Sequence, residues 1–273
     1  MIENMKFYKN LTAWTLVALL FGLTQGAYAG TDWSQNNSSS STAVDHTAWN
    51  VVLQNSITTD STGLNLFDYD AAAATHKSAV AEYVKKLENT TVTALSKPEQ
   101  KALWINLYNA LTVKLIIDNL PVDSIKEIKP SLLSFGPWDK ELTTVEGQAL
   151  SLNDIEHEIL RPLFGDNRIH YAVNCASIGC PNLQNKAYTA DNTEALLDFS
   201  AKQYVNHPRG VTIEDEEDLI LSSIYKWYSE DFGEDEEDLI DHLSKYAEPA
   251  LKTQLELFDE VDDYQYNWDL NQS

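Results

Sequence analysis

One long helix near the middle of the chain constrains the fold more than any other feature. Ser96 is placed to cap its first turn, Pro98 suits that turn, and Glu99 completes a capping box with Ser96. The helix ends before Pro121, because proline cannot continue a helix. Between these ends, apolar and aromatic side chains recur at helical spacing: Trp104, Leu107, Tyr108, Leu111, Leu115 and Ile116. A helix with such a face belongs in the core of a globular domain.

The rest of the chain alternates helical and short extended patterns. We expect helices over residues 43–56, 71–87, 153–160 and 191–206, and more helices from residue 222 onward. Strand composition marks residues 168–174, and a hairpin is expected with strands at 211–213 and 219–221. This mixture predicts a helix-rich α+β fold with a small sheet, and residues 43–273 form one domain without a clear internal boundary.

The N-terminus has the pattern of a secretory signal peptide over residues 1–29. Lys6 and Lys9 precede a short apolar run at 11–23, and small residues flank Tyr28 at the expected cleavage site. The apolar run is short for a membrane span, although an uncleaved anchor is the alternative. We therefore expect a periplasmic or secreted protein without a membrane span after cleavage. Residues 30–42 have the composition of a disordered tether.

Charge excludes several classes of partner. The chain has 42 acidic residues against 19 Lys and Arg, a net charge of −23 at pH 7. Nucleic acids and anionic membrane surfaces are bound mainly through clustered basic side chains, so neither is an expected partner.

Part of this charge lies in a repeated segment, EDEEDLI, at residues 214–220 and 234–240. Neither copy has the alternating ligands and central glycine of an EF-hand calcium loop. We interpret both copies as solvated acidic surface.

Two cysteines, Cys175 and Cys180, allow two interpretations. Cys175 follows the expected strand and precedes small residues whose backbone amides could approach a substrate, as a nucleophile for acyl transfer requires. Alternatively, the four residues between the cysteines permit a disulfide within a turn, which an oxidising compartment favours. The residues leave both interpretations open.

A catalytic thiol would need a base, and two histidines are candidates. His157 lies on the expected helix at 153–160, where Asp154 could orient its imidazole. His170 is close to Cys175 in sequence, but on a strand the two side chains would point to opposite faces. Either histidine could instead have no catalytic role.

Two asparagines, Asn106 and Asn109, share one face of the central helix although asparagine is a poor helix former. They could bind a ligand, orient a histidine or bond to a loop. No metal-ligand spacing links the histidines and cysteines, so we expect no metal and no other cofactor.

Five segments in order resemble the family known as domain of unknown function 547. They are residues 104–116 (WINLYNALTVKLI), 137–164, 168–183 (RIHYAVNCASIGCPNL), 221–233 and 266–271 (YNWDLN). The resemblance covers residues 95–271 and implies a papain-like or transglutaminase-like architecture. By this resemblance Cys175 would be the nucleophile, and His157 or His170 the base. Asn106 or Asn109 would be an orienting or oxyanion group.

Two functions follow as hypotheses. The first is a cysteine-dependent hydrolase of an amide or thioester. The second is a non-catalytic binding module in which Cys175 and Cys180 form a disulfide and aromatic side chains, Tyr171 and Trp227 among them, line a ligand surface. The ligand would be a small molecule or a peptide. The residues expected to contact it are Trp104, Tyr108, Asn109, Trp138 and Asn174.

Overall fold

The computed structural model describes residues 30–131 and 134–273. The expected signal peptide, residues 1–29, lies outside the described residues. Thr31–Ser273 form one compact unit. Within the described ranges, no helix has both the length and the apolar character needed to cross a membrane.

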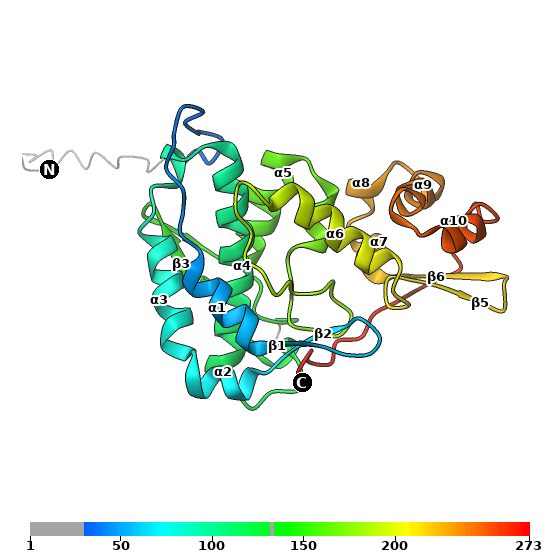
Figure 1. The fold of residues 1–273 in the computed structure, drawn as a ribbon, viewed down its shortest axis with the longest axis horizontal. Coiled ribbons are helices and arrows are strands. Elements are labelled where there is room, and N and C mark those ends of the chain that lie inside the picture. Colours follow the sequence, from blue (N-terminus) through cyan, green and yellow to red (C-terminus); the bar gives the residue numbers. More distant parts are fainter. Residues whose placement is uncertain (1–29, 132–133) are drawn as a thin grey trace, which may run out of the picture. The chain divides into compact units, whose positions relative to one another are not determined.

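Four helices pack together at the N-terminal side of this unit (Figure 1): α1 (Thr47–Ser56), α2 (Tyr69–Thr75), α3 (Lys77–Glu88) and α4 (Lys97–Asn119). The predicted central helix is α4, and it is buried on most of its surface because α2, α3, α6 and η3 contact it. Its predicted capping box does not form. Ser96 makes no side-chain bond to the helix, and Glu99 accepts a hydrogen bond from the Val44 amide instead.

The strands of the described residues are short and form three separate sheets, which confirms the helix-rich α+β class. β1 (Ile57–Thr59) pairs with β2 (Asn65–Phe67), and β3 (Thr143–Val145) pairs with β4 (Gln148–Leu150). The predicted hairpin is present as β5 (Val211–Glu214) and β6 (Asp218–Ser222). β7 (Asp263–Gln265) adds to β6 in parallel orientation.

The remaining helices pack mainly on one another. They are η1 (Val92–Ala94), η2 (Ile125–Glu127), η3 (Asp154–Leu160), α5 (Arg161–Phe164), η4 (Asn167–Tyr171), α6 (Thr193–Val205), α7 (Ser223–Trp227), α8 (Ser229–Phe232), α9 (Glu236–Tyr246) and α10 (Pro249–Leu255). Of these, α7 contacts β6 and β7. One apolar core surrounds α4, and a second lies between α6, the β5–β6 hairpin and α7 to α10.

Two further predictions of local structure are wrong. The expected strand at 168–174 does not form: its first four residues belong to the 3₁₀ helix η4, where Asp166 accepts the Arg168 amide and starts the turn, and residues 172–174 follow as a turn and loop. Residues 31–42, expected to be a disordered tether, pack on the domain. The Trp33 indole lies edge-on to Trp104 at 5.1 Å, and the Asn37 amide donates to the Leu95 carbonyl at 2.8 Å. The buried Trp33 side chain and hydrogen bonds of the backbone therefore hold this polar segment on the domain.

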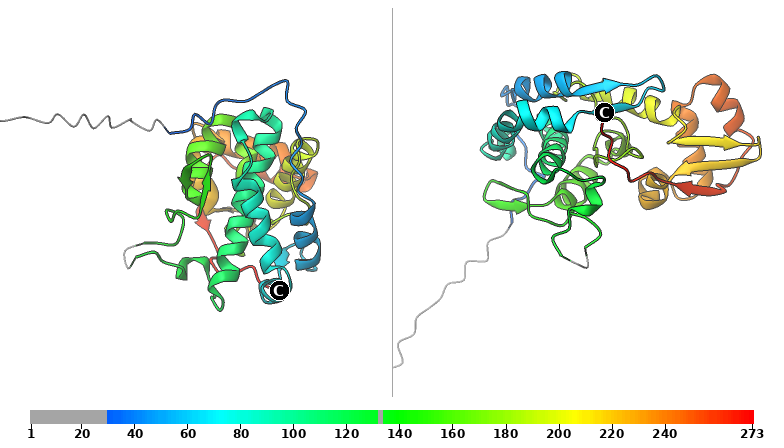
Figure 2. Two further views of the ribbon diagram at one scale, coloured as in Figure 1. Left: turned by 90° about the vertical axis from the view of Figure 1, so that its left-hand side faces the viewer. Right: turned by 90° about the horizontal axis from the view of Figure 1, so that it is seen from below.

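The C-terminal chain links the two cores. After β7 it runs back toward β1 and β2, as the right-hand view of Figure 2 shows, and Gln272 forms a bridge with Phe67. On the way it passes against residues 177–179, where the Gly179 amide donates to the Asn267 carbonyl at 2.8 Å. A Cβ at Gly179 would lie 2.9 Å from the Asn267 backbone, so only glycine permits this approach.

Candidate functional site

A cavity of about 590 Å³ opens between the two cores. Segments far apart in the sequence line it: α4, the residues between 131 and 139 that the structure describes, η3, η4, the loop of the two cysteines, α7 with the residue that follows it, and the C-terminal chain. Its lining includes Tyr108, Trp138, Asp139, Asn153, Glu156, His170, Val173, Cys175, Cys180, Pro181, Ile224, Trp227, Tyr228, Tyr266 and Trp268.

Aromatic rings make up one wall of this cavity. The Trp268 ring lies 5.5 Å from Trp227, 5.6 Å from Trp138 and 4.6 Å from Tyr266. Trp227 is 47% exposed and lies at the rim. Aromatic pairs at these spacings hold one another in place and leave a preformed apolar surface for a ligand.

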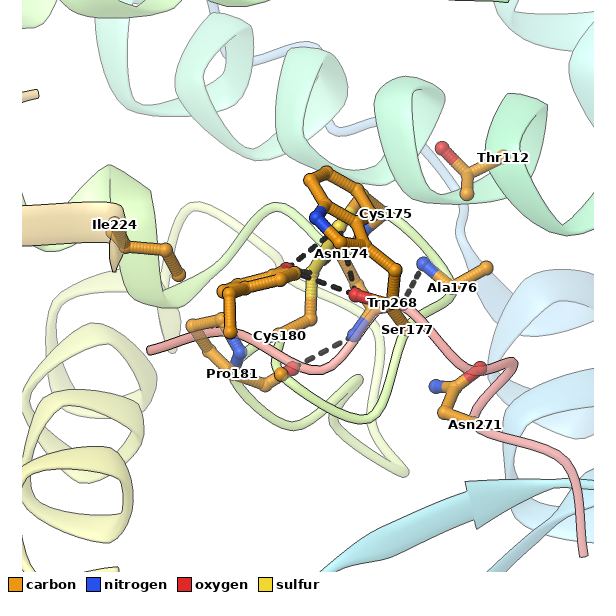
Figure 3. Close-up of a disulfide and its surroundings, with 12 residues drawn as sticks. Thr112, Asn174, Cys175, Ala176, Ser177, Cys180, Pro181, Ile224, Trp268 and Asn271 are labelled. Atoms are coloured by element: carbon orange, nitrogen blue, oxygen red, sulfur yellow. Dashed lines mark hydrogen bonds between the residues drawn. A yellow bond between two sulfur atoms is a disulfide. The ribbon is translucent and has the colours of Figure 1, made fainter. Parts of the chain in front are cut away.

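Cys175 and Cys180 form a disulfide in the cavity wall (Figure 3). Asn174 closes the loop that carries it, since its Nδ2 donates to the Pro181 carbonyl at 2.7 Å and its Oδ1 accepts from the Ala176 amide at 2.8 Å. The Tyr266 hydroxyl lies 3.1 Å from each sulfur. Both sulfurs are therefore held in a rigid loop, and Cys175 carries no free thiol in this structure.

His170 lies at the bottom of the cavity between two carboxylates. Its Nε2 is 2.6 Å from Asp231 Oδ2, and its Nδ1 is 3.7 Å from Glu156 Oε1. The imidazole stacks on the Tyr228 ring at 4.2 Å and is 3% exposed. Nδ1 has no hydrogen-bond partner among the described residues.

Asp231 is shared between His170 and Arg161, whose Nε is 2.6 Å from the same carboxylate oxygen. Burial acts to raise the pKa of Asp231, but the hydrogen bonds from His170 and Arg161 outweigh it, so this pKa lies well below the usual range. Asp231 is therefore ionised and fixes the orientation of the imidazole.

Glu156 is a buried carboxyl, 4% exposed, that reaches the cavity from η3. This segment is π-helical, with the Arg161 amide donating to the Glu156 carbonyl, and such wider turns recur at functional sites. Burial and the charge of Glu156 raise the pKa of Tyr108 and of Tyr228, so both phenols stay neutral. No lysine or arginine is among the described residues that line the cavity.

His157, the other predicted base, is not among the residues that line the cavity. Its Nδ1 lies 3.1 Å from Arg161 Nη1, and the Arg161 guanidinium is also paired with Asp231 and Glu230. In this arrangement neither His157 nor His170 contacts a cysteine sulfur.

The two asparagines of α4 are buried and bonded to loops of the same domain. Asn106 bonds both backbone groups of Tyr188, at 2.7 and 3.0 Å. Asn109 donates to the Ala172 carbonyl at 2.9 Å and accepts from the Asn174 amide at 2.8 Å. Trp104, on the same helix, lies within the core.

The structure therefore brings only some of the predicted site residues together. Tyr108, Trp138, His170 and Cys175 share the cavity, whereas the lining does not include Trp104, Asn106, Asn109, His157, Tyr171 or Asn174. Sequence reasoning missed Glu156, Tyr228, Tyr266 and Trp268 as site residues. A signal was present for Glu156, which occupies one position of the otherwise apolar helical stripe Leu152, Ile155, Ile159 and Leu160.

Among the residues described, no cluster of three or more His, Cys, Asp or Glu side chains has the arrangement of a metal site. The segment 92–205 matches the family model described as "Protein of unknown function, DUF547". It includes α4, Glu156, His170 and both cysteines, and it ends before the aromatic residues of the C-terminal chain. No curated protein and no solved structure matches the chain.

Proposed function

Because residues 92–205 belong to the DUF547 family, a family of unknown function, we propose a function from the site itself. The protein is a non-catalytic binding module that takes a small molecule or the side chain of a peptide into the aromatic cavity. The Cys175–Cys180 disulfide serves to hold one wall of this cavity in place.

The observation that carries this proposal is the cavity and its lining. Its volume of about 590 Å³ lies within the range of small-molecule sites, which combine apolar walls with a few convergent polar groups. Here the walls are Trp138, Trp227 and Trp268, and the polar groups are Glu156 and His170.

The state of the cysteines favours binding over acyl transfer. A sulfur within a disulfide is not a nucleophile, since the thiolate is the reactive form. His170 lines the cavity with its Nε2 bonded to Asp231, but no hydrogen bond joins it to a cysteine sulfur among the described residues. A preformed pocket with these partners is suited to holding a ligand.

An oxidising compartment is part of the same proposal. The pattern of residues 1–29 supports export, and a disulfide persists outside the cytosol. We place the protein in the periplasm or in the medium.

Tryptophan fluorescence tests the binding function, because three of the seven tryptophans line the cavity. The probes are a panel of small aromatic compounds with cationic, neutral and anionic members. We expect at least one member to change the emission with saturation. Trp227→Ala should weaken that binding about tenfold, the effect of losing one aromatic contact.

Phe199→Ala is the matched control. The exposed fraction of Phe199, 50%, is close to the 47% of Trp227. Phe199 lies on α6 and is not among the residues that line the cavity. Its loss should leave the affinity unchanged. Saturable binding that Trp227→Ala does not weaken, or a panel without any binder, contradicts the proposal.

A second function has one observation in its favour: Cys175 and His170 line the same cavity. After reduction by a dithiol, Cys175 Sγ would attack the acyl carbon of a thioester and expel its thiol. Water would then release the acid and regenerate the cysteine.

S-phenyl thioacetate tests this hydrolase. If it exists, the reduced protein turns the probe over, Cys175→Ala loses the activity and Cys180→Ala retains it. A reduced wild-type protein that is no faster than the buffer rules the hydrolase out.

A further inference from the structure

We propose that the ligand of this cavity is a cation, an organic ammonium group bound by the Glu156 carboxylate and the surrounding aromatic rings. This inference rests on the proposed binding function and specifies the chemical class of the ligand.

The charges that line the cavity have one sign. Glu156 and Asp139 are its acidic lining residues, and no lysine or arginine is among the described lining residues. Behind the wall, Arg161 is already paired with Asp231 and Glu230, each at 2.6 Å. Even with His170 protonated and Lys126 counted beside Trp268, the positive groups number three and the carboxylates four: Asp139, Glu156, Glu230 and Asp231. The site therefore has an unbalanced negative charge.

Glu156 is the carboxylate that most needs a positive partner. It is 4% exposed, and its one approach to a basic group within the described chain is His170 Nδ1 at 3.7 Å, beyond hydrogen-bond distance. Nδ1 itself is buried without a partner. Burying a charge is costly unless it is paired and hydrogen-bonded, and an ammonium group in the cavity would supply the missing partner.

The groups that face Glu156 allow a cationic ligand to bind to it near neutral pH, because none of them is a second anion. They are the phenols of Tyr108 and Tyr228 and the imidazole of His170. Burial and the neighbouring charge raise the pKa of both phenols, so neither becomes a competing anion. Both hydroxyls remain able to donate to the carboxylate.

Aromatic faces complete the recognition of a cation. The rings of Trp138, Trp227 and Trp268 lie within 4.6–5.6 Å of their aromatic neighbours and form one continuous surface. The negative face of an indole attracts an ammonium group. Lys126 shows this preference within the protein, since its Nζ lies 4.8 Å from the centre of the Trp268 ring.

The net charge of −23 supports the same class of ligand, because a strongly negative protein raises the local concentration of cations and their rate of encounter.

A pair of isosteric probes tests the inference. Benzyltrimethylammonium carries the cation, and 2,2-dimethylpropylbenzene has the same shape with carbon in place of nitrogen. Phenylmethanesulfonate is the anionic counterpart. Binding to the full mature chain is followed by ligand-observed NMR at constant ionic strength. We expect the cation to bind at least about tenfold more tightly than its neutral isostere, and the sulfonate not to bind.

Glu156→Gln removes the charge and keeps the size of the side chain, so it should abolish the preference for the cation. Glu158→Gln is the matched control, since Glu158 lies on the same segment but is exposed to solvent. It should keep the preference.

Each result decides between the two proposals. Equal binding of cation and isostere by the wild-type protein overturns cation recognition even if Glu156→Gln does not fold, and it leaves the binding function intact. A preference that survives in a folded Glu156→Gln also overturns it. If neither these probes nor the aromatic panel binds, the binding function itself fails.

Discussion

His46 and His242 are buried histidines that the fold holds neutral. Burial, assisted by the nearby charges of Lys86 and Lys245, lowers the pKa of each imidazole to about 4. His46 Nδ1 lies 2.6 Å from the Tyr83 hydroxyl, while its Nε2 has no partner among the described residues. Neither imidazole can accept a proton without a cost to the folded state.

We predict that the free energy of unfolding decreases as the pH falls from 6.5 toward 4. In this window the unfolded chain binds a proton at His46 and the folded protein does not, so protons favour unfolding. For one imidazole the lowered pKa corresponds to about 3 kcal/mol when protonation is complete. Urea unfolding at pH 7 and pH 4.5 measures this decrease, which His46→Gln should reduce.

His76→Gln is the control for this experiment, since His76 is half-buried at the junction of α2 and α3. Between pH 7 and pH 4.5 the free energy of unfolding of His76→Gln should decrease by as much as that of the wild-type protein. An unchanged pH dependence in His46→Gln would show that the fold does not hold this imidazole neutral.

The residues of the site differ in how far the sequence could identify them. Cys175 and His170 stand out by residue type, and both line the cavity. Glu156 does not stand out by residue type, because an acid on a helix is most often solvated. Its position among apolar residues at helical spacing carries the opposite signal.

At the scale of secondary structure, α4 supports the loops that shape the site. The segments around Tyr188 and Asn174 are irregular, so some of their backbone groups have no hydrogen-bond partner in a helix or a sheet. The side chains of Asn106 and Asn109 supply these partners. Polar side chains inside a helix that is otherwise buried are satisfied in this way. The two side-chain amides therefore hold these loops in place on α4.

Asn106→Ala should destabilise the protein by about 3 kcal/mol, because it leaves both backbone groups of Tyr188 buried without partners. Urea unfolding measures the change. The folded fraction should bind ligand as the wild-type protein does, since Asn106 does not line the cavity.

Asn119→Ala provides the comparison on the same helix. Asn119 is exposed and bonds only the Leu115 carbonyl one turn away, so its loss should cost no more than about 0.5 kcal/mol. Equal costs for the two variants would contradict the supporting role of Asn106.

The repeated segment EDEEDLI shows why local sequence does not determine every element. Its first copy forms the turn of the β5–β6 hairpin, with positive φ at Asp215 and Glu216. Its second copy begins α9, where Asp235 caps the helix by accepting the Asp238 amide. The residues outside the repeat decide the outcome: Val211 and Leu221 flank the first copy and pair with each other in the hairpin, whereas Leu243 and Tyr246 follow the second copy and pack at helical spacing in the core.

At the scale of the whole molecule, the site depends on the path of the C-terminal chain, which returns to the loop of the two cysteines. The central helix and the β5–β6 hairpin follow from local patterns, and their predictions are confirmed. The cavity is assembled from segments between residues 108 and 268, so neither its aromatic wall nor the contact of Tyr266 with both sulfurs follows from local periodicity. The papain-like or transglutaminase-like architecture stays a prediction.

The state of the two cysteines distinguishes the two proposed functions. A binding module has a disulfide in the cavity wall, whereas a hydrolase needs Cys175 as a free thiol. Alkylation of the folded, non-reduced protein with iodoacetamide, followed by mass spectrometry, measures this state directly. We predict no adduct at Cys175 or Cys180 and a mass lower than that of the dithiol by two hydrogen atoms. Rapid modification of Cys175 in the native protein would contradict a binding module held by this disulfide.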